Sequence, residues 1–580
     1  MFKIEQSKSG HSYAIYNGLH LHSRYDPERE ARKFVASHIG NRTPDTAIVV
    51  GSGLGYIAAE LRRRGVFTIQ IFLSPFTYSA AVEHGDVAWA PESKQESSID
   101  AVTDQARHNV DEAALRAFLR SQLSDTDSVG LEVLSWTPCM EAFPDEAEEA
   151  LEVVVDVVRE SNANLTTIAA FGTRWFRNLC TNFRDTRAVQ GAAFSSKHVV
   201  IAAAGPSLEA AIPALQEFYH LQGEIWAVGT ALRPLISAGI RPSLVVTTDA
   251  GYYALEHLNA VRTSPDYCIA APLTAAQGIT RRGSGLLLIN QGSIIEQELF
   301  SNCRLPVTCV PANGTVAGSA LELALRVCSG RVVLVGLDLG YRDIQPHARP
   351  HSFEHYLERQ ESRLRPLYGM FAARALEHSA RISGGRRTTR QLDTYAQWFQ
   401  RRLSQLQHRV ATLGPSLLEI GAPHISHSEL MQLAKENRLA VTAPHGVRTR
   451  IQKYSEGGSG DASTYRSAEG SADAWTVELT DLERSKTLSS MLGALETRVE
   501  RVAAVTTRQQ FLSLLHPRRS QSTHERPGLH AADIEVLSYL NCRGVLNCIR
   551  QASPTAFRAE LADTVETVRT LLHEQKREQA

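Results

Sequence analysis

The sequence contains no apolar run that approaches the roughly 18 residues a membrane-spanning helix needs. Its net charge of −1 leaves no excess of one sign that would attract nucleic acid or an anionic membrane. The first ten residues, MFKIEQSKSG, hold no apolar core of signal-peptide length. We therefore expect a cytoplasmic protein that binds neither membranes nor nucleic acid.

Cysteine is scarce, and its spacing is uninformative. The eight cysteines form no CxxC pair and no zinc-binding pattern, and several lie in apolar segments, where a cysteine is usually a small buried hydrophobic residue. We expect a reduced protein without a structural metal.

The chain of 580 residues is long enough for two or more domains. Composition and periodicity divide it into residues 1–165, a β element followed by a Rossmann-like domain; 166–194, a connecting helix; 195–440, a central doubly wound α/β domain; 441–475, a linker or loop; and 476–580, a helical region. The predicted fold class is α/β. A separate acidic helix is expected to begin at Pro144.

The N-terminal segment carries strong local signals. Asn17-Gly18 between short alternating stretches predicts a β-hairpin turn. Asp26 followed by Pro27 predicts a capped helix that runs to about Ile39.

A Rossmann-like pattern follows, in which an apolar run enters the glycine-rich turn Gly51-Ser52-Gly53-Leu54-Gly55 and then a helix. Such a turn is typical of a nucleotide or S-adenosylmethionine pocket. The next strand, however, ends in Leu73-Ser74-Pro75 and not in the acid that would hold ribose hydroxyls. The sequence therefore favours a tight turn without a working cofactor site.

The central segment is organised around the stretch from His198 to Asp249. An apolar run stops at Gly205-Pro206-Ser207 and a helical pattern begins, so free N–H groups and the positive end of a helix dipole face one point. Two further strand-like runs end in Gly229-Thr230 and in Thr248-Asp249. Ligands of open parallel sheets bind beyond the carboxyl ends of the strands, so these turns predict one anion-binding site.

Two later units repeat the order strand, polar turn, helix. Asn313-Gly314-Thr315 lies between an apolar run and a helical pattern, and another apolar run stops at Asp338. A histidine-rich stretch follows, with His347, His351 and His355 four residues apart. Because Pro350 interrupts a helix there and no carboxylate set completes a site, we predict no metal, but one histidine acting as a base or a phosphate partner.

Four ordered motifs in the central segment, AAAGPSLE, GTALRPLISAGIRPSLVVTTD, NGTVAGSALELA and GLDLGY, resemble the central domain of the motility-associated factor (Maf) flagellin glycosyltransferases. That domain is also described as 6-hydroxymethylpterin diphosphokinase MptE-like (DUF115). LHSRYDPEREA and RWFRNLCTNF resemble flanking segments of the same family, and the resemblance covers most of residues 15–400.

This resemblance implies a central domain similar to bacterial sialyltransferases and a function in flagellar assembly and motility. It implies transfer of a nonulosonic acid, of the pseudaminic or legionaminic type, from a CMP-activated donor to Ser or Thr of flagellin. The partners would be flagellin and the nucleotide sugar, and the C-terminal helices leave a homo-oligomer as an option. No cofactor is required, although Mg²⁺ is left open.

Within that interpretation each turn receives a function. Gly205, Pro206 and Ser207 would hold the donor phosphate, and Gly229 and Thr230 would border the nucleotide. Asn313, Gly314 and Thr315 would bind the CMP or the sugar carboxylate.

The remaining functions fall to charged side chains. Asp249 would bind a ribose or sugar hydroxyl, or a metal, and Asp338 with His347 would activate the acceptor hydroxyl, with His351 as second choice. Arg233 or Arg342 would balance the donor's negative charge.

Several alternatives stay open. Asp249 and Asp338 could cap helices, and Arg233 could be a surface residue of its helix. The first rival function is a pterin diphosphokinase using ATP and Mg²⁺, for which these two aspartates are the obvious carboxylates. The second is a non-catalytic flagellin-binding protein. The central segment has no DxD motif, which makes a required metal less expected.

Overall fold

In the computed structural model of the chain, the fold is α/β, as the sequence predicts. The structure describes residues 2–40, 44–91, 110–192, 195, 197–259, 267–303, 305–377, 381–383, 386–404, 406, 408–414, 420–441, 450–453, 475–515, 531–551 and 553–579. Within these ranges, every helix is too short or too polar to span a bilayer.

The chain forms two compact units. Unit 1 comprises Met1–Gly172 with Thr497–Thr570, and unit 2 comprises Thr173–Glu496 with Leu571–Ala580. Three helices run from one unit into the other: α6 (Pro144–Asp185), α16 (Asp481–Ala503) and α20 (Pro554–Gln579). The helices predicted as one C-terminal region are thus divided between the units.

The helix α6 corrects one expectation. The sequence predicts two helices, one from Pro144 and one over 166–194, whereas the structure has a single helix of 42 residues. The polar stretch Arg159–Asn164 weakens the apolar pattern without breaking the helix, because helix propensity differs little among such residues.

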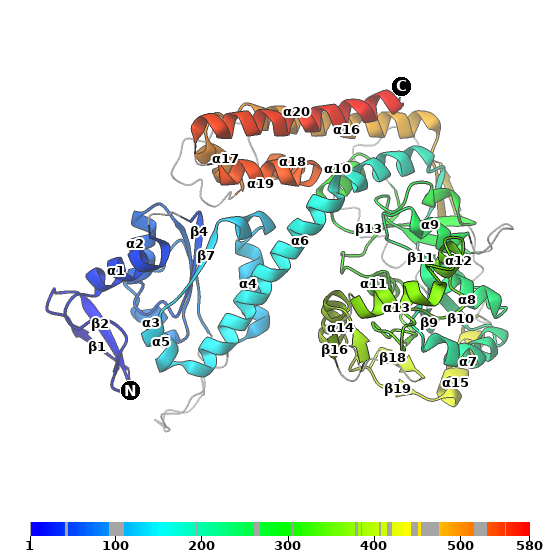
Figure 1. Cartoon of the computed structure of the whole chain (residues 1–580), viewed down its shortest axis with the longest axis horizontal. Helices are drawn as coiled ribbons and strands as arrows, with labels where there is room; N and C mark the ends of the chain where they lie inside the picture. Colours follow the sequence, from blue (N-terminus) through cyan, green and yellow to red (C-terminus); the bar gives the residue numbers. More distant parts are fainter. Residues whose placement is uncertain are drawn as a thin grey trace. The chain divides into compact units, whose positions relative to one another are not determined.

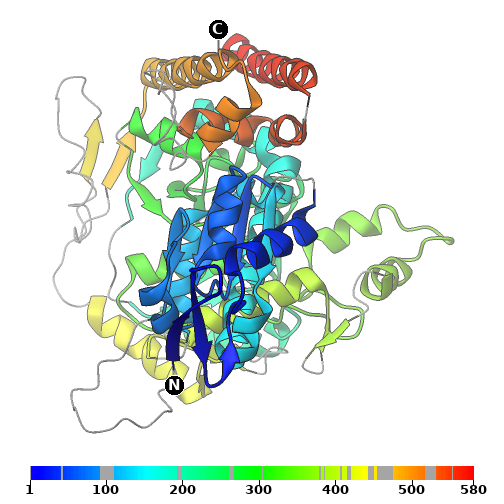
Figure 2. The same cartoon turned by 90° about the vertical axis from the view of Figure 1, so that its left-hand side faces the viewer.

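Unit 1 begins with the antiparallel strands β1 (Phe2–Gln6), β2 (Ser12–Tyr16) and β3 (Leu19–His20). The predicted hairpin turn is confirmed, since Asn17 and Gly18 both have positive φ, 47° and 87°. The predicted helix is confirmed as α1 (Pro27–Ile39), with the Asp26 side chain accepting from the Arg29 amide. Figure 2 shows these strands in dark blue beside α1.

The larger sheet of unit 1 has four parallel strands in the order β6-β5-β4-β7. The strands are β4 (Thr46–Val50), β5 (Phe67–Ile71), β6 (Val87–Trp89) and β7 (Leu131–Ser135). The helices of this unit include α2 (Tyr56–Arg63), α3 (Pro75–Ala80), α4 (Glu112–Gln122), α5 (Thr137–Ala142), α17 (Arg508–Leu515), α18 (Ala531–Leu540) and α19 (Cys542–Arg550).

Unit 2 is built on a nine-stranded parallel sheet in the order β14-β13-β12-β11-β10-β9-β15-β18-β19, which Figure 1 shows in green to yellow. The strands are β9 (Val199–Ala202), β10 (Glu224–Val228), β11 (Leu244–Val246), β12 (Cys268–Ala271), β13 (Gly285–Asn290), β14 (Val307–Cys309), β15 (Val332–Val335), β18 (Val410–Leu413) and β19 (His424–Ile425).

Helices cover both faces of this sheet, so the predicted doubly wound arrangement is confirmed. Val199 and Ile201 face α11 (Val316–Val327) and α14 (Arg390–Leu403), whereas Val200 and Ala202 face α7 (Leu208–His220), α8 (Leu232–Ser237) and α15 (His427–Val441). Burial on both faces explains why these strands are continuous apolar runs. The chain builds outward from β9 to β14 and then returns to β15 on the other side of β9, which makes the carboxyl end of β9 the topological switch point.

Shorter elements complete unit 2. They are α9 (Tyr253–Leu258), α10 (Ile294–Ser301), α12 (Ser352–Glu358), α13 (Leu367–Glu377), the pair β16 (Arg381–Ser383) and β17 (Arg386–Thr388), and a sheet of β20 (Arg450–Lys453), β21 (Trp475–Glu478) and β8 (Ala188–Gln190). Strand β20 falls inside the predicted linker 441–475, and residues 442–449 and 454–474 of that linker lie outside the described residues.

Candidate active site

The predicted turns of the central segment gather at one edge of the nine-stranded sheet. Four neighbouring strands of the sheet, β11, β10, β9 and β15, each end next to one of these turns. Gly229, Thr247 and Gly336 directly follow β10, β11 and β15, and Gly205 lies three residues after the end of β9. This is the edge where ligands of doubly wound sheets bind.

The turn after β9 is already occupied by a side chain of the protein. The Ser207 amide donates to Oδ2 of Asp338 at 2.7 Å, and the Gly205 amide donates to the Gly336 carbonyl at 2.7 Å. A Cβ on Gly205 would collide with both Asp338 and Gly336. Asp338 is buried, with 1% of its surface exposed. The positive end of α7 therefore faces the carboxylate of Asp338. From the sequence, Asp338 could cap a helix that follows its own strand, β15, but it instead binds the amino end of α7, which follows β9.

Asp249 has a different environment from Asp338. Its side chain is exposed, and its Oδ1 accepts from the Gly251 amide at 2.8 Å in a local turn. It does not cap α9, whose first turn begins after Tyr252. Within the described part of the chain no side chain pairs with its Oδ2, so this carboxylate can accept hydrogen bonds from a ligand.

The predicted turn Asn313-Gly314-Thr315 caps α11. Thr315 Oγ1 accepts from the Gly318 amide, and Asn313 Oδ1 accepts from the Thr315 amide. The turn follows β14 at the outer edge of the sheet, so strand order alone does not place it beside Gly205. Val316, directly after it, packs against the cores on both faces of the sheet. That contact places the turn beyond the strand ends, on the side of the other turns.

Three histidines from different elements come together at this edge. His347 stacks on His351 with ring centroids 4.4 Å apart and an interplanar angle of 6°, and His351 lies 5.3 Å from His257 of α9. The Ala348 amide donates to the Ala204 carbonyl, which fixes this loop to the end of β9. His351 is the N-cap of α12, so His347 lies before the helix and not on its face. The side chain of His355 lies outside the described residues.

Burial keeps these imidazoles neutral. It lowers the pKa of His347 to about 4 and that of His351 to about 2, with smaller contributions from the neighbouring imidazoles and, for His351, from Arg233. The pKa of His257 is also lowered by burial, against the opposing effect of the Asp249 charge. Nδ1 of His351 accepts from the Phe353 amide, so the neutral ring carries its proton on Nε2, which is buried and has no partner among the described residues. A buried donor of this kind requires an acceptor, which a ligand oxygen can supply.

Stacked rings do not aim their nitrogens at a common point. Among the residues that the structure describes, no group of three or more His, Cys, Asp or Glu side chains is arranged to hold a metal ion. What the cluster does offer a ligand is the Nε2–H of His351, which has no acceptor among the described residues.

The two arginines predicted to face the donor differ sharply. Arg342 is paired with Glu209, which also accepts from Gln345 and from the Arg349 amide. Burial alone would raise the pKa of Glu209, but these hydrogen bonds and the Arg342 charge lower it overall. Arg233 is half-buried on α8 and close enough to lower the pKa of His351, and it has no carboxylate within ion-pair distance in the described ranges.

Comparison with known proteins identifies the domain that carries this site. Residues 173–343 match the family model of the 6-hydroxymethylpterin diphosphokinase MptE-like proteins. These residues therefore form an MptE-like domain. Over 287 residues the chain is 26% identical to an "Uncharacterized protein" of Treponema pallidum (strain Nichols), a match that spans 49% of this chain and 60% of that relative's length.

The fold also has a solved counterpart. The structure of a MAf glycosyltransferase from Magnetospirillum magneticum AMB-1 aligns with a TM-score of 0.54 and 11% identity, covering 100% of this chain and 91% of that one. At this identity the likeness concerns the fold. The family-model match thus confirms the MptE-like resemblance of the central motifs, and the solved structure shares the fold.

The MptE-like domain begins on α6, and two asparagines of that helix were missed by the sequence interpretation. Asn178 Nδ2 donates to the carbonyls of Ala250 and Thr274, both at 3.1 Å. Asn182 donates to three carbonyls between Leu273 and Ala276, and its Oδ1 accepts from the Gly278 amide. Both side chains are buried, so α6 holds the loops after β11 and β12 in place. The available signal was that Asn178 and Asn182, four residues apart, share one face of a helix.

His257 and Thr247 of the MptE-like domain were also missed. A Cβ placed on Gly229 would have His257 and Thr247 as its nearest neighbours, each 3.8 Å away, so these residues pack against the turn after β10. An isolated histidine in YYALEHL gave no signal, because only the packing of α9 against α12 brings it to His351.

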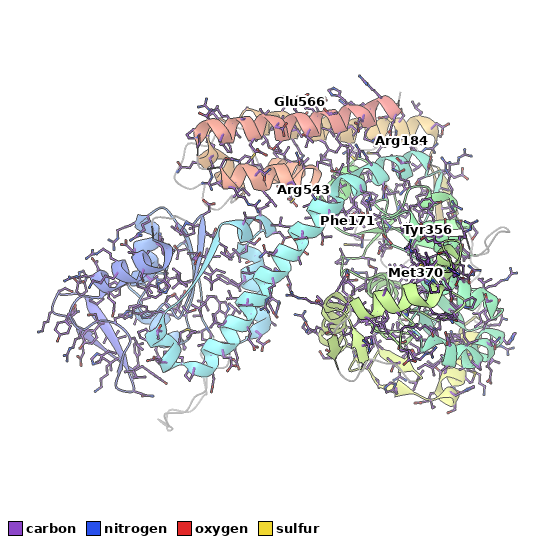
Figure 3. The ribbon with its side chains drawn as sticks, viewed as in Figure 1. Phe171, Arg184, Tyr356, Met370, Arg543 and Glu566 are labelled. Atoms are coloured by element: carbon purple, nitrogen blue, oxygen red, sulfur yellow. The ribbon has the colours of Figure 1, made fainter. Side chains whose placement is uncertain are left out.

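Aromatic rings continue the α9–α12 contact outward. Tyr253 lies edge-on to Phe353 at 5.5 Å and to Tyr356 at 5.3 Å, with the two tyrosine hydroxyls 3.4 Å apart. Figure 3 labels Tyr356 on α12. Because Tyr252 and Tyr253 are exposed, this aromatic contact borders the candidate site on its solvent side.

The glycine-rich turn of unit 1 is closed by the protein. The Leu54 amide donates to Nε2 of His22 at 2.8 Å, and a Cβ on Gly53 would collide with the same ring. A Cβ on Gly55 would collide with the Glu83 carbonyl. Burial lowers the pKa of His22 to about 3, so the ring is neutral. The space that a cofactor pyrophosphate would need is filled by His22, in agreement with the absence of an acid after β5.

Proposed function

We propose that this chain is a cytoplasmic glycosyltransferase that moves a nonulosonic acid, of the pseudaminic or legionaminic type, from a CMP-activated donor to Ser or Thr of flagellin. The MptE-like domain, the fold shared with a MAf glycosyltransferase and the four central motifs support this proposal. The observation that carries it is the buried Nε2 of His351, which has no partner among the described residues, lies in a loop fixed to the end of β9 and is within electrostatic range of Arg233.

The proposed donor is anionic at two groups, its phosphate and its sugar carboxylate. Arg233 supplies a positive charge, and the buried Nε2–H of His351 supplies an unused donor, so an oxyanion satisfies both. The turn after β10, where His257 and Thr247 pack against Gly229, borders the nucleotide in this proposal. Asp249, whose Oδ2 has no hydrogen-bond partner among the described residues, binds a hydroxyl of the ribose or the sugar.

In the proposed reaction the acceptor oxygen forms a bond to the anomeric carbon as the bond from that carbon to the CMP phosphate oxygen breaks. The electron pair of the broken bond leaves with CMP, and the proton of the acceptor hydroxyl passes to a ring nitrogen of His347. His347 is half-buried, whereas His351 is buried. A weak base is sufficient when bond breaking leads, because the hydroxyl becomes acidic only as its new bond forms.

Asp338 receives a positioning function in this proposal. Its Oδ2 accepts from the Ser207 amide and its side chain is buried, so it holds the turn after β9 and does not reach an acceptor. Gly205, Pro206 and Ser207 then shape the site wall, and the donor phosphate is assigned to Arg233 and His351.

A pterin diphosphokinase is the second candidate, because the family model carries that description. Such an enzyme needs carboxylates for the magnesium of ATP. Of the two aspartates at the strand ends, only Asp249 is exposed. The glycosyltransferase is therefore the better-supported function.

The experiment incubates the purified full chain with CMP-activated nonulosonic acids and flagellin, with and without Mg²⁺, and measures the intact mass of flagellin. We expect a mass increase of one sugar per modified site, with CMP released. Parallel reactions with ATP and 6-hydroxymethylpterin test for a pterin diphosphate. CMP binding without transfer or pterin product would favour a non-catalytic flagellin-binding protein.

Single substitutions, measured in the same assay, test which residues form the active site. Arg233→Gln and His347→Gln are expected to lower transfer at least tenfold, since each removes a charge-assisted contact or the base. Arg326→Gln, an exposed arginine at the far end of α11, is the matched control and should leave transfer unchanged. Full activity in both site variants would refute the site while leaving the reaction class standing.

A further inference from the structure

A row of basic residues lies at the other edge of the nine-stranded sheet. His198, Arg331 and Arg409 each directly precede a strand, β9, β15 and β18 respectively. Those strands are neighbours, and Val332 is paired with both Val199 and Val410. The three basic residues therefore stand side by side at the amino ends of the strands, opposite the candidate active site.

These residues form the floor of a cavity of about 480 Å³. His408 also lines it, and Glu429 and Glu436 of α15 face it from the other side. The two carboxylates balance the two guanidinium charges overall. The placement of free hydrogen-bond donors, and not net charge, therefore decides what the cavity can bind.

The carboxylates in this cavity already have partners. Oε2 of Glu436 lies 2.9 Å from Nε2 of His198, and its Oε1 accepts from Gln432 at 3.1 Å. Oε2 of Glu429 accepts from the amide and the hydroxyl of Ser426, at 2.7 and 2.8 Å. Both acids are thus held by the helix α15 and its neighbours.

The guanidinium groups, by contrast, have no carboxylate partner among the described residues, and the Nε of each is buried without an acceptor there. The Arg331 side chain makes no hydrogen bond and no ion pair with any described residue, and its Nε is buried. Glu429 is near enough to Arg331 to interact electrostatically but lies beyond 4.0 Å. Arg409 donates only to backbone carbonyls, those of Leu325, Cys328 and Gly330, and its Nε is also buried without a partner.

We propose that this cavity binds a phosphate-bearing ligand, with Arg331 and Arg409 holding the phosphate oxygens. Planar guanidinium groups with unused N–H donors match the geometry of phosphate. The carboxylate oxygens of Glu429 and Glu436 can accept from hydroxyl or amino groups of the same ligand, which favours a nucleotide over inorganic phosphate. This site is separate from the proposed donor site and does not depend on the proposed glycosyltransferase activity.

Calorimetry on the full chain tests the proposal, with inorganic phosphate, pyrophosphate, CMP and cytidine titrated separately in a phosphate-free buffer. We expect saturable binding of CMP or of the inorganic anions and none of cytidine. Tighter binding of CMP than of phosphate would identify a nucleotide as the ligand, and equal binding would identify an inorganic anion; both results support a phosphate site.

Variants locate the binding. Arg331→Gln should weaken it about tenfold or more and Arg331→Lys less, because lysine keeps the charge and loses the planar donors. Arg438→Gln, on the same helix α15 but outside the cavity, is the matched control. Arg233→Gln separates this site from the proposed donor site, because it should leave binding here unchanged.

Hydrogen exchange gives an independent readout. Bound ligand should protect residues 329–331 and 429–436. The proposal is overturned if no phosphate-bearing probe binds, if Arg331→Gln binds as tightly as the unmodified chain, or if protection is confined to residues 229–257.

Discussion

The chain contains two strand–turn–helix units that look alike and do different work. In unit 1 the turn Gly51–Gly55 receives the neutral ring of His22, and in unit 2 the turn Gly205–Ser207 receives the carboxylate of Asp338. Each of these two side chains, which we call the plug of its turn, accepts a hydrogen bond from a backbone amide of the turn. The first turn is then enclosed by apolar core and backbone, whereas the second adjoins Arg233 and the histidine cluster. The comparison shows that the surroundings of a glycine turn, and not its glycine pattern, locate a binding site.

The largest expected effect tests how tightly the first turn is closed. Gly55→Ala should lower the free energy of unfolding of unit 1 by at least about 3 kcal/mol, because Gly55 has φ +91° and the new Cβ would meet the Glu83 carbonyl. Gly65→Ala, at φ +78° with open space around it, should cost only about 1–2 kcal/mol. Urea unfolding followed by hydrogen exchange measures both. Equal costs for the two variants would show that the turn is not closed.

The second effect tests the plug of the other turn. Asp338→Ala should cost about 2–3 kcal/mol, because it removes the acceptor of the Ser207 amide and leaves a cavity where the buried Asp338 carboxylate was. Asp338→Asn keeps an acceptor oxygen and should retain most stability and transfer activity. If Asp338 were instead the catalytic base, Asp338→Asn would lower the rate by about 100-fold or more at unchanged stability, which a rate and a melting curve distinguish.

The third effect uses pH to test whether His22 is held neutral in the first turn. Between about pH 3 and 6.5 the unfolded chain binds a proton at His22 that the folded chain excludes, so the free energy of unfolding falls as pH falls through this window. From pH 7 to pH 5 the loss attributable to His22 should be about 2 kcal/mol. His22→Gln, which keeps an acceptor for the Leu54 amide, should reduce the loss in unit 1 by that amount. An unchanged pH dependence would mean that His22 is not excluded from protonation.

The smallest expected effect concerns Arg233, near the histidine cluster beside the turn Gly205–Ser207. Arg233→Gln should change the free energy of unfolding by less than about 0.5 kcal/mol, because the Arg233 side chain makes no ion pair in the described part of the chain. The pKa of His351 should rise, since one of the charges that lower it is removed. Thermal unfolding and histidine NMR titration measure these quantities. A cost above about 2 kcal/mol would assign Arg233 to the core and not to a ligand.

Local features were predictable from the sequence. The Asp26 cap of α1, the Asn17-Gly18 turn and the Thr315 cap of α11 depend on residues within four positions of one another. The polar endings of the strands could likewise be read directly. The continuity of α6 could not, because packing outweighs the small propensity differences in its polar stretch.

The long-range arrangements required the structure. His347 and His257 are brought to His351 by the contact of α9 with α12. His198 and Arg331 are 133 residues apart, and only the pairing of β9 with β15 makes them neighbours.

By itself the sequence determined that the central domain is a series of strands ending in glycine or polar turns, because strand, turn and helix preferences act over a few residues. Only the tertiary structure decided which turn amides remain free. His22 and Asp338 reach their turns because strands and loops distant in sequence are placed side by side. Whether the amides of a turn are left for a ligand or bound by another side chain of the protein depends on which distant segments are placed beside the turn. No local sequence pattern encodes that placement.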